Sequence, residues 1–567
     1  MQETLISFEH FTFQYRAQSE PTLYDINLTI NKGERVIIVG ASGCGKSTLA
    51  HCLNGLIPYS YPGHSEGKLS VCGIEAKNSS IFELSQFVGT VLQDTDGQFI
   101  GMTVLEDIAF SLENDCVPKE EMLDRTREEA LKVHLLDKMK ASPHELSGGQ
   151  KQRVSMAGVL INRIPVLLFD EPLANLDPAA GKAAVELIDE IQKKSDTTVI
   201  IIEHRLEDAL HMGADRIILM EDGRIICDTT PSVLFAGDRL LKAGIREPLY
   251  ITAMKYAGID LKPEMKLQRI QELELTKEIK DGIRSWYYNQ SPPRKAEKSA
   301  NLLSVDELSF GYTEEKMNLN RIGFTVRNGE MISIVGKNGA GKSTLAKLLC
   351  GFEKSDSGSI TLKGKEISED TIKERAQFIG YVMQNPNQMI SKPMIFDEVA
   401  LSLRVRKLSE EDITERVHRV LKKCGLYEFR KWPVSALSYG QKKRVTIASI
   451  LVQEPEILIL DEPTAGQDFR HYTEFMEFLK ELNGHGITVM MITHDMHLML
   501  EYTERTFVFA DGEMIADTTP SALFSNRELI GRASLKETSL FWIAEQAEIP
   551  AEQFIEKFIA YDRQVRN

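Results

Sequence analysis

The chain contains an internal repeat, and this duplication limits its possible folds more than any other feature. The segments 40–47 and 336–343 share the pattern Gly-x-x-x-x-Gly-Lys-Ser. Three later segments recur at nearly the same spacing, namely 146–150 with 437–441, 170–172 with 461–463, and 228–235 with 517–524. A unit of about 290 residues therefore occurs twice, and both copies should adopt one fold.

Each copy of the pattern lies between a predicted strand and a predicted helix. The apolar runs 36–39 and 332–335 precede the glycine-rich segments, and apolar helical patterns follow them. In this context backbone N–H groups and a helix N-terminus bind phosphate, and the lysine reaches its outer oxygens. Two nucleoside triphosphates are thus expected at once. Their predicted ligands are Gly40, Ser42, Gly43, Gly45, Lys46, Ser47 and Thr48, and in the second copy Gly336, Asn338, Gly339, Gly341, Lys342, Ser343 and Thr344.

Strands alternate with helical patterns through both copies, which predicts an α/β fold with a mostly parallel sheet covered on both faces. The expected strands are 5–15, 166–169 and 199–202, with 302–312, 457–460 and 489–492 in the second copy. Residues 237–300 join the copies. Their first part, 240–288, has helical periodicity, and the segment 289–300 with Pro292-Pro293 indicates an exposed linker. We expect four parts, which are 1–236, 237–300, 301–525 and 526–567.

Composition narrows the class of protein. A chain with 42% hydrophobic and 26% charged residues is typical of a globular protein in water. Its apolar runs are too short to span a bilayer, and its first residues lack the features of a secretion signal. The net charge of −16 disfavours a nucleic-acid partner. Seven scattered cysteines without a C-x-x-C pair indicate free thiols, so we expect the protein in the cytosol, free or docked on a membrane partner.

Five elements follow one another in the same order in both copies. After each phosphate loop come a glutamine, an L-S-x-G-Q segment, an apolar strand ending in Asp-Glu-Pro, a turn ending in Asp177 or Asp468, and a histidine. This order resembles the ATP-binding cassette family over nearly the whole chain. The resemblance implies two tandem P-loop NTPase domains of that type, each with a mostly parallel core sheet, an antiparallel β subdomain and a helical subdomain. It also implies ATP and Mg²⁺ as cofactors and ATP hydrolysis as the activity.

The resemblance and the positions of the residues together assign roles. Glu171 and Glu462 follow strand ends and can polarise the attacking water. The expected Mg²⁺ ligands are Ser47, Gln93 and Asp170, and in the second copy Ser343, Gln384 and Asp461. The remaining expected catalytic residues are Gln93, Gln384, His204 and His494, and the family stacks adenine on an aromatic residue at the positions of Tyr15 and Tyr312.

The L-S-x-G-Q segments precede the helical patterns 151–160 and 442–451, so their amides form a further anion site. In the family this site serves the ATP of the other cassette, which implies two head-to-tail sites. One would combine Lys46, Glu171 and His204 with Ser438, Gly440 and Gln441, and the other Lys342, Glu462 and His494 with Ser147, Gly149 and Gln150. Both are expected to hydrolyse ATP. Tyr439 replaces the glycine of the first copy, and it either alters the first site or points harmlessly to solvent.

The surroundings of the two glutamines look like those of energy-coupling-factor importers. The second copy has the Asn-Pro-Asn-Gln segment 385–388, which resembles the ATPases of these importers, and so does the segment 53–58. The first copy departs from this pattern, because Asp94-Thr95-Asp96 stands in place of the Asn-Pro context. The implied partners are a T-type transmembrane protein and a small substrate-binding membrane protein, with this chain peripheral on the cytoplasmic face of the cell membrane. The cargo stays open among vitamins, their precursors and transition metal ions.

Two alternatives remain from the sequence. A tandem-cassette translation factor acting on ribosomes usually carries a long charged linker, and residues 237–300 are only mildly basic. A sugar-importer ATPase usually has one weakened site, but the second copy here keeps every motif residue.

Overall fold

The computed structural model describes residues 3–93, 96–173, 176–291, 299–313, 317–465 and 467–566. The described chain divides into two compact units. The first contains the residues up to Trp286 together with Asp468–Arg470, and the second contains Tyr287–Gln467 and the residues from His471, so that a boundary falls within each of the helices 277–289 and 469–484. Most of the helix 277–289 belongs to the first unit, and most of the helix 469–484 belongs to the second. Pro292-Pro293 and Asp94-Thr95, which the sequence singled out, lie outside the described residues.

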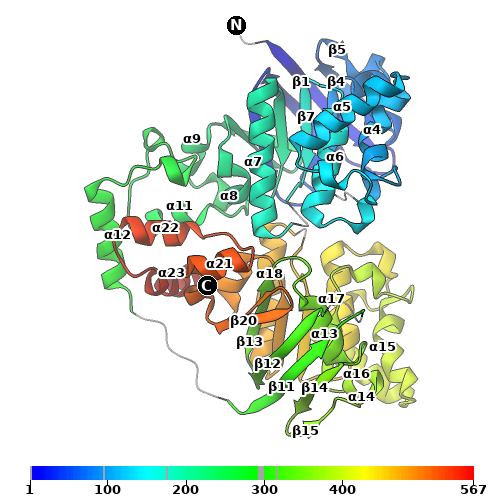
Figure 1. Cartoon of the computed structure of the whole chain (residues 1–567), viewed down its shortest axis with the longest axis vertical. Coiled ribbons are helices and arrows are strands. Elements are labelled where there is room, and N and C mark those ends of the chain that lie inside the picture. Colours follow the sequence, from blue (N-terminus) through cyan, green and yellow to red (C-terminus); the bar gives the residue numbers. More distant parts are fainter. Residues whose placement is uncertain are drawn as a thin grey trace. The chain divides into compact units, whose positions relative to one another are not determined.

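The first unit contains two sheets (Figure 1). The antiparallel sheet has the order β2-β1-β4-β5, and the other has the order β10-β9-β3-β8-β7-β6 with β10 as its antiparallel strand. The strands are β1 Thr4–Tyr15, β2 Leu23–Asn31, β3 Arg35–Gly40, β4 Gly63–Val71, β5 Ile74–Glu75, β6 Val88–Val91, β7 Val166–Asp170, β8 Thr198–Ile202, β9 Arg216–Glu221 and β10 Arg224–Thr229.

Helices precede and follow the parallel strands along the chain. The helices are α1 Lys46–Leu53, α2 Leu56–Tyr59, α3 Ile81–Ser85, α4 Val104–Asn114, α5 Lys119–Lys132, α6 Gly148–Leu160, α7 Pro178–Ser195, α8 Leu206–Ala209, α9 Pro231–Ala236, α10 Arg239–Lys242, α11 Leu249–Tyr256 and α12 Lys277–Asn289. One hydrophobic core joins the antiparallel sheet, α1 and one face of the parallel strands. The phosphate loop between β3 and α1 is therefore fixed from both sides.

The second unit repeats this architecture with the sheet orders β12-β11-β14-β15 and β16-β17-β18-β13-β19-β20. Its strands are β11 Asn301–Phe310, β12 Leu319–Arg327, β13 Met331–Gly336, β14 Ser357–Leu362, β15 Lys365–Glu366, β16 Ile379–Val382, β17 Ile457–Asp461, β18 Thr488–Ile492, β19 Arg505–Ala510 and β20 Glu513–Thr518. Its helices are α13 Lys342–Cys350, α14 Ile372–Arg375, α15 Ile395–Val405, α16 Glu410–Lys423, α17 Tyr439–Leu451, α18 Phe469–Gly484, α19 Met496–Tyr502, α20 Pro520–Phe524, α21 Arg527–Arg532, α22 Ser539–Gln546 and α23 Ala551–Arg566. Its core has the same composition of elements.

The sequence predicted this fold class, and the structure confirms it. Each predicted parallel strand is present, and the apolar runs are buried throughout because helices cover both faces of such a sheet. Strand β11 ends at Phe310, two residues earlier than the predicted range 302–312, so Tyr312 lies beyond the strand.

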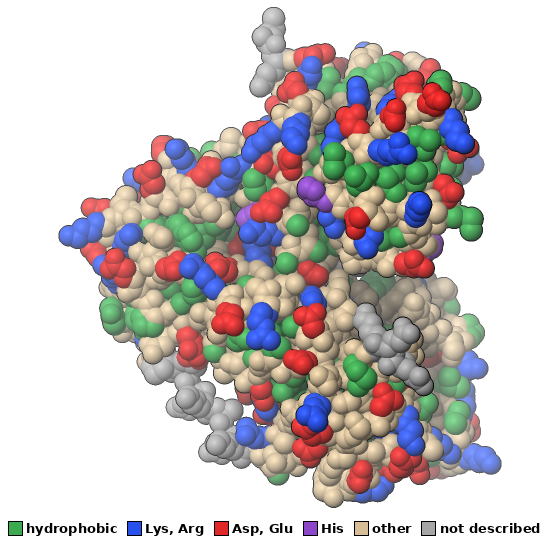
Figure 2. Space-filling view, in the orientation of Figure 1, with side chains coloured by type: hydrophobic (Ala, Val, Ile, Leu, Met, Phe, Trp, Pro, Cys, Tyr) green, Lys and Arg blue, Asp and Glu red, His purple; other side chains and the backbone are tan. Residues whose placement is uncertain are grey.

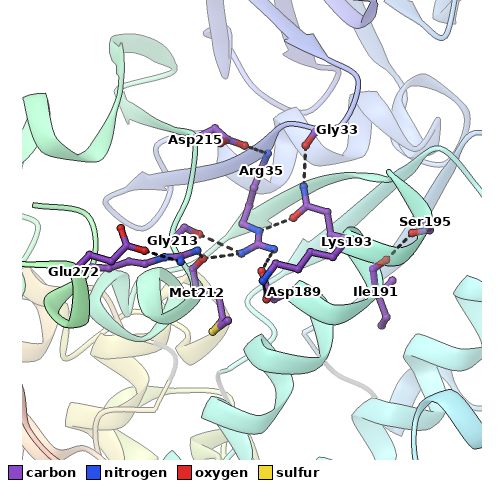
Figure 3. Close-up of polar contacts among 12 residues, drawn as sticks. Gly33, Arg35, Asp189, Ile191, Lys193, Ser195, Met212, Gly213, Asp215 and Glu272 are labelled. Atoms are coloured by element: carbon purple, nitrogen blue, oxygen red, sulfur yellow. Dashed lines mark hydrogen bonds and ion pairs between the residues drawn. The ribbon is translucent and has the colours of Figure 1, made fainter. Parts of the chain in front are cut away.

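A buried polar cluster ties the start of β3 to α7 in the first unit (Figure 3). The Arg35 guanidinium donates to Asp189 at 2.8 Å, to Gln192 at 2.7 Å and to the carbonyl of Met212 at 3.0 Å. Strand β13 of the second unit begins with Met331 at the equivalent register. The cluster therefore distinguishes the first unit from the second.

Residues after α9 pack as a small helical appendage on the first unit. Ser232 donates to Gln268 at 2.7 Å, and the Leu249 amide at the start of α11 donates to Glu207 of α8 at 2.8 Å. Arg269 donates to the carbonyl of Met212, which Arg35 also contacts. The helices α21 to α23 come after α20 at the corresponding place of the second unit, as the repeat predicts. The four-part division of the chain at residues 236, 300 and 525 stays a prediction.

No helix in the described parts of the chain is long and apolar enough to cross a membrane. On the face shown in Figure 2, basic and acidic side chains are interspersed over the coloured surface. A broad field of one sign is not visible on that face.

Candidate functional site

Both phosphate-loop lysines fold back over their own loops. Lys46 is the first residue of α1, and its Nζ donates to the carbonyls of Gly40 and Ala41 at 2.9 Å each. Lys342 makes the same bonds to Gly336 at 2.7 Å and Lys337 at 2.9 Å. Both lysines are buried. They hold the loop in shape and keep a positive charge beside the N-terminus of the following helix, where phosphate binds best.

The last glycine of each loop is required by its backbone. Gly45 and Gly341 both have φ of 100°, in the left-handed region. A Cβ on Gly45 would lie 2.9 Å from Leu23 Cδ2, and one on Gly341 would lie 2.8 Å from the carbonyl oxygen of Asn318. A larger residue would displace the loop, because both the backbone and the neighbouring strand oppose it. The remaining predicted ligands are exposed in the loop itself (Ser42, Gly43, Asn338 and Gly339) or lie in the first turn of the following helix (Ser47, Thr48, Ser343 and Thr344).

The carboxylates lie at the carboxyl ends of β7 and β17. Asp170 and Asp461 close these strands, and the next residues, Glu171 and Glu462, have φ of 49° and 45°. The amide of each glutamate donates to the end of the neighbouring strand, at Ile202 and Ile492, at 2.9 Å. A left-handed backbone is uncommon for a glutamate and marks a position held by its surroundings.

In the first unit three predicted catalytic side chains meet. Gln93 Nε2 donates to Glu171 Oε2 at 2.5 Å, and His204 Nε2 lies 2.9 Å from Glu171 Oε1. These residues come from the segment after β6, the end of β7 and the end of β8, which are neighbouring strands. Burial is the main cause that raises the pKa of Asp170 to about 6, and the charge of the adjacent Glu171 raises it further. Lys46 and Ser47 act in the opposite direction.

The second unit arranges the same residues differently. Ser343 Oγ donates to Asp461 Oδ2 at 3.0 Å, and so does the hydroxyl of Tyr381 on β16 at 2.9 Å. His494 Nε2 lies 3.4 Å from Glu462 Oε1, which is a longer contact than in the first unit. Burial raises the pKa of Glu462. Gln384 accepts a hydrogen bond from Tyr439 through its main-chain oxygen at 3.3 Å.

Each L-S-x-G-Q serine caps a helix. Ser147 accepts from the Gln150 amide at 3.4 Å, and the Gln150 side chain accepts from the Ser147 amide at 3.0 Å. Ser438 and Gln441 form the same capping box. The helices therefore begin at Gly148 and Tyr439, earlier than the predicted ranges 151–160 and 442–451, since the motif itself supplies the cap. Gly149 and Gly440 lie in the first turn, where free N–H groups are found.

The aromatic residues predicted to stack on adenine differ between the units. The hydroxyl of Tyr15 pairs with Thr48 at 3.0 Å, and its ring packs edge-on against Phe13. Tyr312 is half exposed, and its hydroxyl accepts from Lys347 at 3.5 Å. Each tyrosine thus lies beside the helix that follows the phosphate loop. Tyr439 is 42% exposed, yet its hydroxyl bonds to Gln384, so it is not simply directed to solvent.

Three polar residues near the carboxylates were missed from the sequence. They are Glu203, Tyr381 and Lys443. Lys443 is 3% exposed and donates to the Pro463 carbonyl at 2.7 Å, where Gln152 makes the matching bond to Pro172 at 2.6 Å. Glu203 sits one residue before His204, and Tyr381 faces Asp461 across adjacent strands. A comparison of the two copies position by position could have identified Glu203 as a difference between them, because Thr493 stands at its position in the second copy.

Comparisons with known proteins identify two matching families and relatives of the whole chain. A family described as ABC transporter matches residues 23–174 and 319–465, and one described as ATP-binding cassette cobalt transporter matches residues 237–310. A protein of Enterococcus faecalis (strain ATCC 700802 / V583) is 57% identical over 100% of both chains. One of Clostridium perfringens (strain 13 / Type A) is 54% identical, also over 100% of both chains. Their names provisionally describe them as ABC transporter ATP-binding proteins.

A solved structure is also similar to part of the chain. It is that of cbiO1 from Clostridium perfringens, described as part of the ABC transporter complex cbiONQ. It matches 44% of this chain and 99% of its own length at 36% identity, with a TM-score of 0.39. The two cassette matches and the full-length relatives identify the family: the chain belongs to the ABC transporter family as an ATP-binding ATPase with two cassettes.

Proposed function

We propose that this chain is the ATP-hydrolysing, energy-coupling subunit of a membrane importer of the energy-coupling-factor type. The single observation that carries the proposal concerns the segment that joins the two cassettes. Residues 237–310, which include α10, α11 and α12, match a family described as ATP-binding cassette cobalt transporter. This match lies between the two residue ranges that the general ABC transporter family matches, 23–174 and 319–465.

In this proposal the chain works at the cytoplasmic face of the cell membrane. A T-type transmembrane protein receives the motion, and a small substrate-binding membrane protein selects the cargo. The cargo is a vitamin, a vitamin precursor or a transition metal ion. Because the partner selects it, no residue of this chain is assigned to cargo binding.

The catalytic assignment rests on the residues at the ends of β7 and β17. Glu171 and Glu462 act as the bases that polarise water, and His204 and His494 orient that water and the terminal phosphate. The contacts of Glu171 with Gln93 and His204 support this role. The phosphate loops and the adenine-side tyrosines, Tyr15 and Tyr312, bind the nucleotide.

The residues proposed for Mg²⁺ are Ser47, Gln93 and Asp170 in the first unit and Ser343, Gln384 and Asp461 in the second. Their donor atoms are hydroxyl, amide and carboxylate oxygens, the ligands that this hard cation prefers. The short contact of Ser343 with Asp461 supports a common ligand pair. When bound, the ion would neutralise charge on the phosphates.

The ATP cycle converts binding into motion. The family resemblance implies that Ser147, Gly149 and Gln150 grip the ATP of the second cassette, and that Ser438, Gly440 and Gln441 grip that of the first. ATP then joins the two cassettes, and loss of the terminal phosphate releases them. Release and closure would move the transmembrane partner.

Purification from membranes tests the proposal. The full chain, tagged and expressed from its own chromosomal locus, should be recovered with integral membrane proteins, and its ATP turnover should depend on Mg²⁺. The double variant Glu171→Gln with Glu462→Gln is the matched control, since it should keep the partners and lose the turnover. Recovery of ribosomes without an integral membrane protein would favour the translation-factor alternative and overturn this proposal.

A further inference from the structure

Glu203 is a buried carboxylate that connects two segments of the first catalytic site. It follows β8 directly and is 2% exposed. Its Oε1 accepts from the amides of His204 at 2.9 Å and Arg205 at 3.2 Å. Its Oε2 accepts from the amide of Leu173 at 3.2 Å. One side chain therefore satisfies three main-chain donors from two separate segments.

The two connected segments carry the catalytic pair. Leu173 lies two residues after Glu171, and His204 is the residue next to Glu203. His204 and Glu171 are themselves 2.9 Å apart. The main chain of Glu203 is fixed in turn, because its amide donates to Ile38 of β3 at 3.3 Å. The bridge thus holds both members of the pair against the strand that leads into the phosphate loop.

A carboxylate at this depth is costly unless its oxygens are satisfied. Burial raises the pKa of Glu203, while Arg205 and the amide donors act in the opposite direction. A buried acid whose oxygens accept three backbone N–H groups is stable only while those segments stay in place. The arrangement therefore responds to any movement of either segment.

The second unit lacks this bridge at the equivalent position. Thr493 follows β18 and precedes His494, and its amide donates to Ile334 of β13 at 3.2 Å, as Glu203 does to Ile38. Its hydroxyl accepts only from the nearby Asp495 amide, at 2.9 Å, among the hydrogen bonds of the described chain. The catalytic pair of this unit, His494 and Glu462, is 3.4 Å apart. The units share the main-chain anchor and differ in the side chain.

We propose that Glu203 is a positioning residue for hydrolysis at Glu171, which keeps His204 and Glu171 in contact by tying their two segments together. This inference rests on the proposed roles of Glu171 and His204. It makes the first unit preorganised and leaves the second to assemble its pair when nucleotide binds. Glu203 itself does not touch the nucleotide in this account.

The test uses the full chain with its membrane partners in the Glu462→Gln background, where turnover reports on Glu171. Glu203→Thr installs the residue of the second unit and should lower kcat roughly tenfold, with KM for ATP changed by less than about twofold. The kcat of Glu203→Gln should lie between that of the Glu203→Thr variant and that of the chain with Glu203 intact. The reason is that the one carbonyl oxygen of glutamine can accept hydrogen bonds from only one of the two segments. Thr493→Val in the Glu171→Gln background is the matched control, and its kcat should change by less than about twofold.

Amide hydrogen exchange on the same variants provides the second readout and needs no turnover. Glu203→Thr should speed exchange at Leu173, His204 and Arg205 and leave β3 and α7 unchanged. Unchanged kcat or unchanged exchange at these amides would overturn the proposal, as would an equal loss of kcat in Thr493→Val. If Glu171→Gln leaves full turnover in the Glu462→Gln background, the proposed role of Glu171 fails, while the exchange result still decides whether Glu203 bridges the segments.

Discussion

At the scale of single residues, equivalent positions in the two units have different surroundings. Glu171 is hydrogen-bonded to Gln93 and lies close to His204, while Glu462 has a longer contact with His494. Tyr381 donates to Asp461, and Thr90 occupies the matching position on β6. These differences arise from residues outside the shared motifs. They suggest two ATP sites of unequal activity.

Substitution of the two glutamates measures that inequality. We expect Glu171→Gln to remove more of the total ATP turnover of the complex than Glu462→Gln, with the two residual rates differing by at least about twofold. The reason is that Glu171 already has its partners in place. Steady-state phosphate release on matched preparations gives the rates. Glutamine has nearly the same shape as glutamate, so each substitution removes the charge of one site without disturbing its packing. Equal losses of turnover would therefore show that the two sites are equivalent.

His51 on α1 gives the first unit a pH-dependent stability. Its ring stacks on Tyr61 with centroids 4.9 Å apart, and burial lowers its pKa. The neutral ring is favoured in the folded state, so the stabilisation is complete above the unfolded pKa of about 6.5 and is lost as the pH falls below it. His51→Gln should therefore flatten the decline of the thermal midpoint between about pH 7.5 and pH 5.5. Substitution of the exposed His64 by glutamine should leave that decline as it was.

The contact among three predicted site residues could be expected from the sequence because each follows a predicted strand of the same sheet. Gln93, Glu171 and His204 are far apart along the chain, yet they follow neighbouring strands of one parallel sheet. Their meeting point was therefore predictable. The contacts of Glu203 were not predictable, because a lone glutamate after an apolar strand does not indicate which main-chain amides its side chain will reach.

At the scale of elements, the phosphate loop depends on the anchoring of β3. The loop begins where β3 ends, and Arg35 at the start of β3 is buried against α7 (Figure 3). The strands themselves were predictable from apolar runs. The Arg35 cluster was not, because no pattern in the sequence indicates that Asp189, far along the chain in α7, is buried against Arg35.

Removal of this arginine should destabilise the first unit. Arg35→Met leaves Asp189 buried without its guanidinium partner, at a cost of about 3 kcal/mol. Lys193 also contacts Asp189, at 2.7 Å, but its side chain is 67% exposed. Lys193→Met is thus the matched control and should cost less than about 1 kcal/mol. Urea unfolding followed by amide exchange of α7 measures both, and equal losses would show that Arg35 has no special role.

At the scale of the whole molecule, duplication explains most of what the sequence predicted. Two copies with the same order of motifs had to form two units of the same architecture, and both sheets have equivalent strand orders. Divergence between the copies explains what was missed. Where one copy changed a residue, as with Arg35 and Met331 or Glu203 and Thr493, the motifs carried no information about the consequence.

Two intact phosphate loops predict two nucleotides bound to each chain. Equilibrium dialysis of the full chain with a slowly hydrolysed ATP analogue and Mg²⁺ should give two equivalents. Lys46→Ala and Lys342→Ala should each lose one, because each lysine holds its own loop through two carbonyls and supplies the charge beside the phosphates. The weakened site should bind at least about tenfold less tightly, as expected when a charge-assisted bond is removed. Loss of both equivalents in either single variant would mean that the loops do not bind independently, and that one nucleotide is needed before the other can bind.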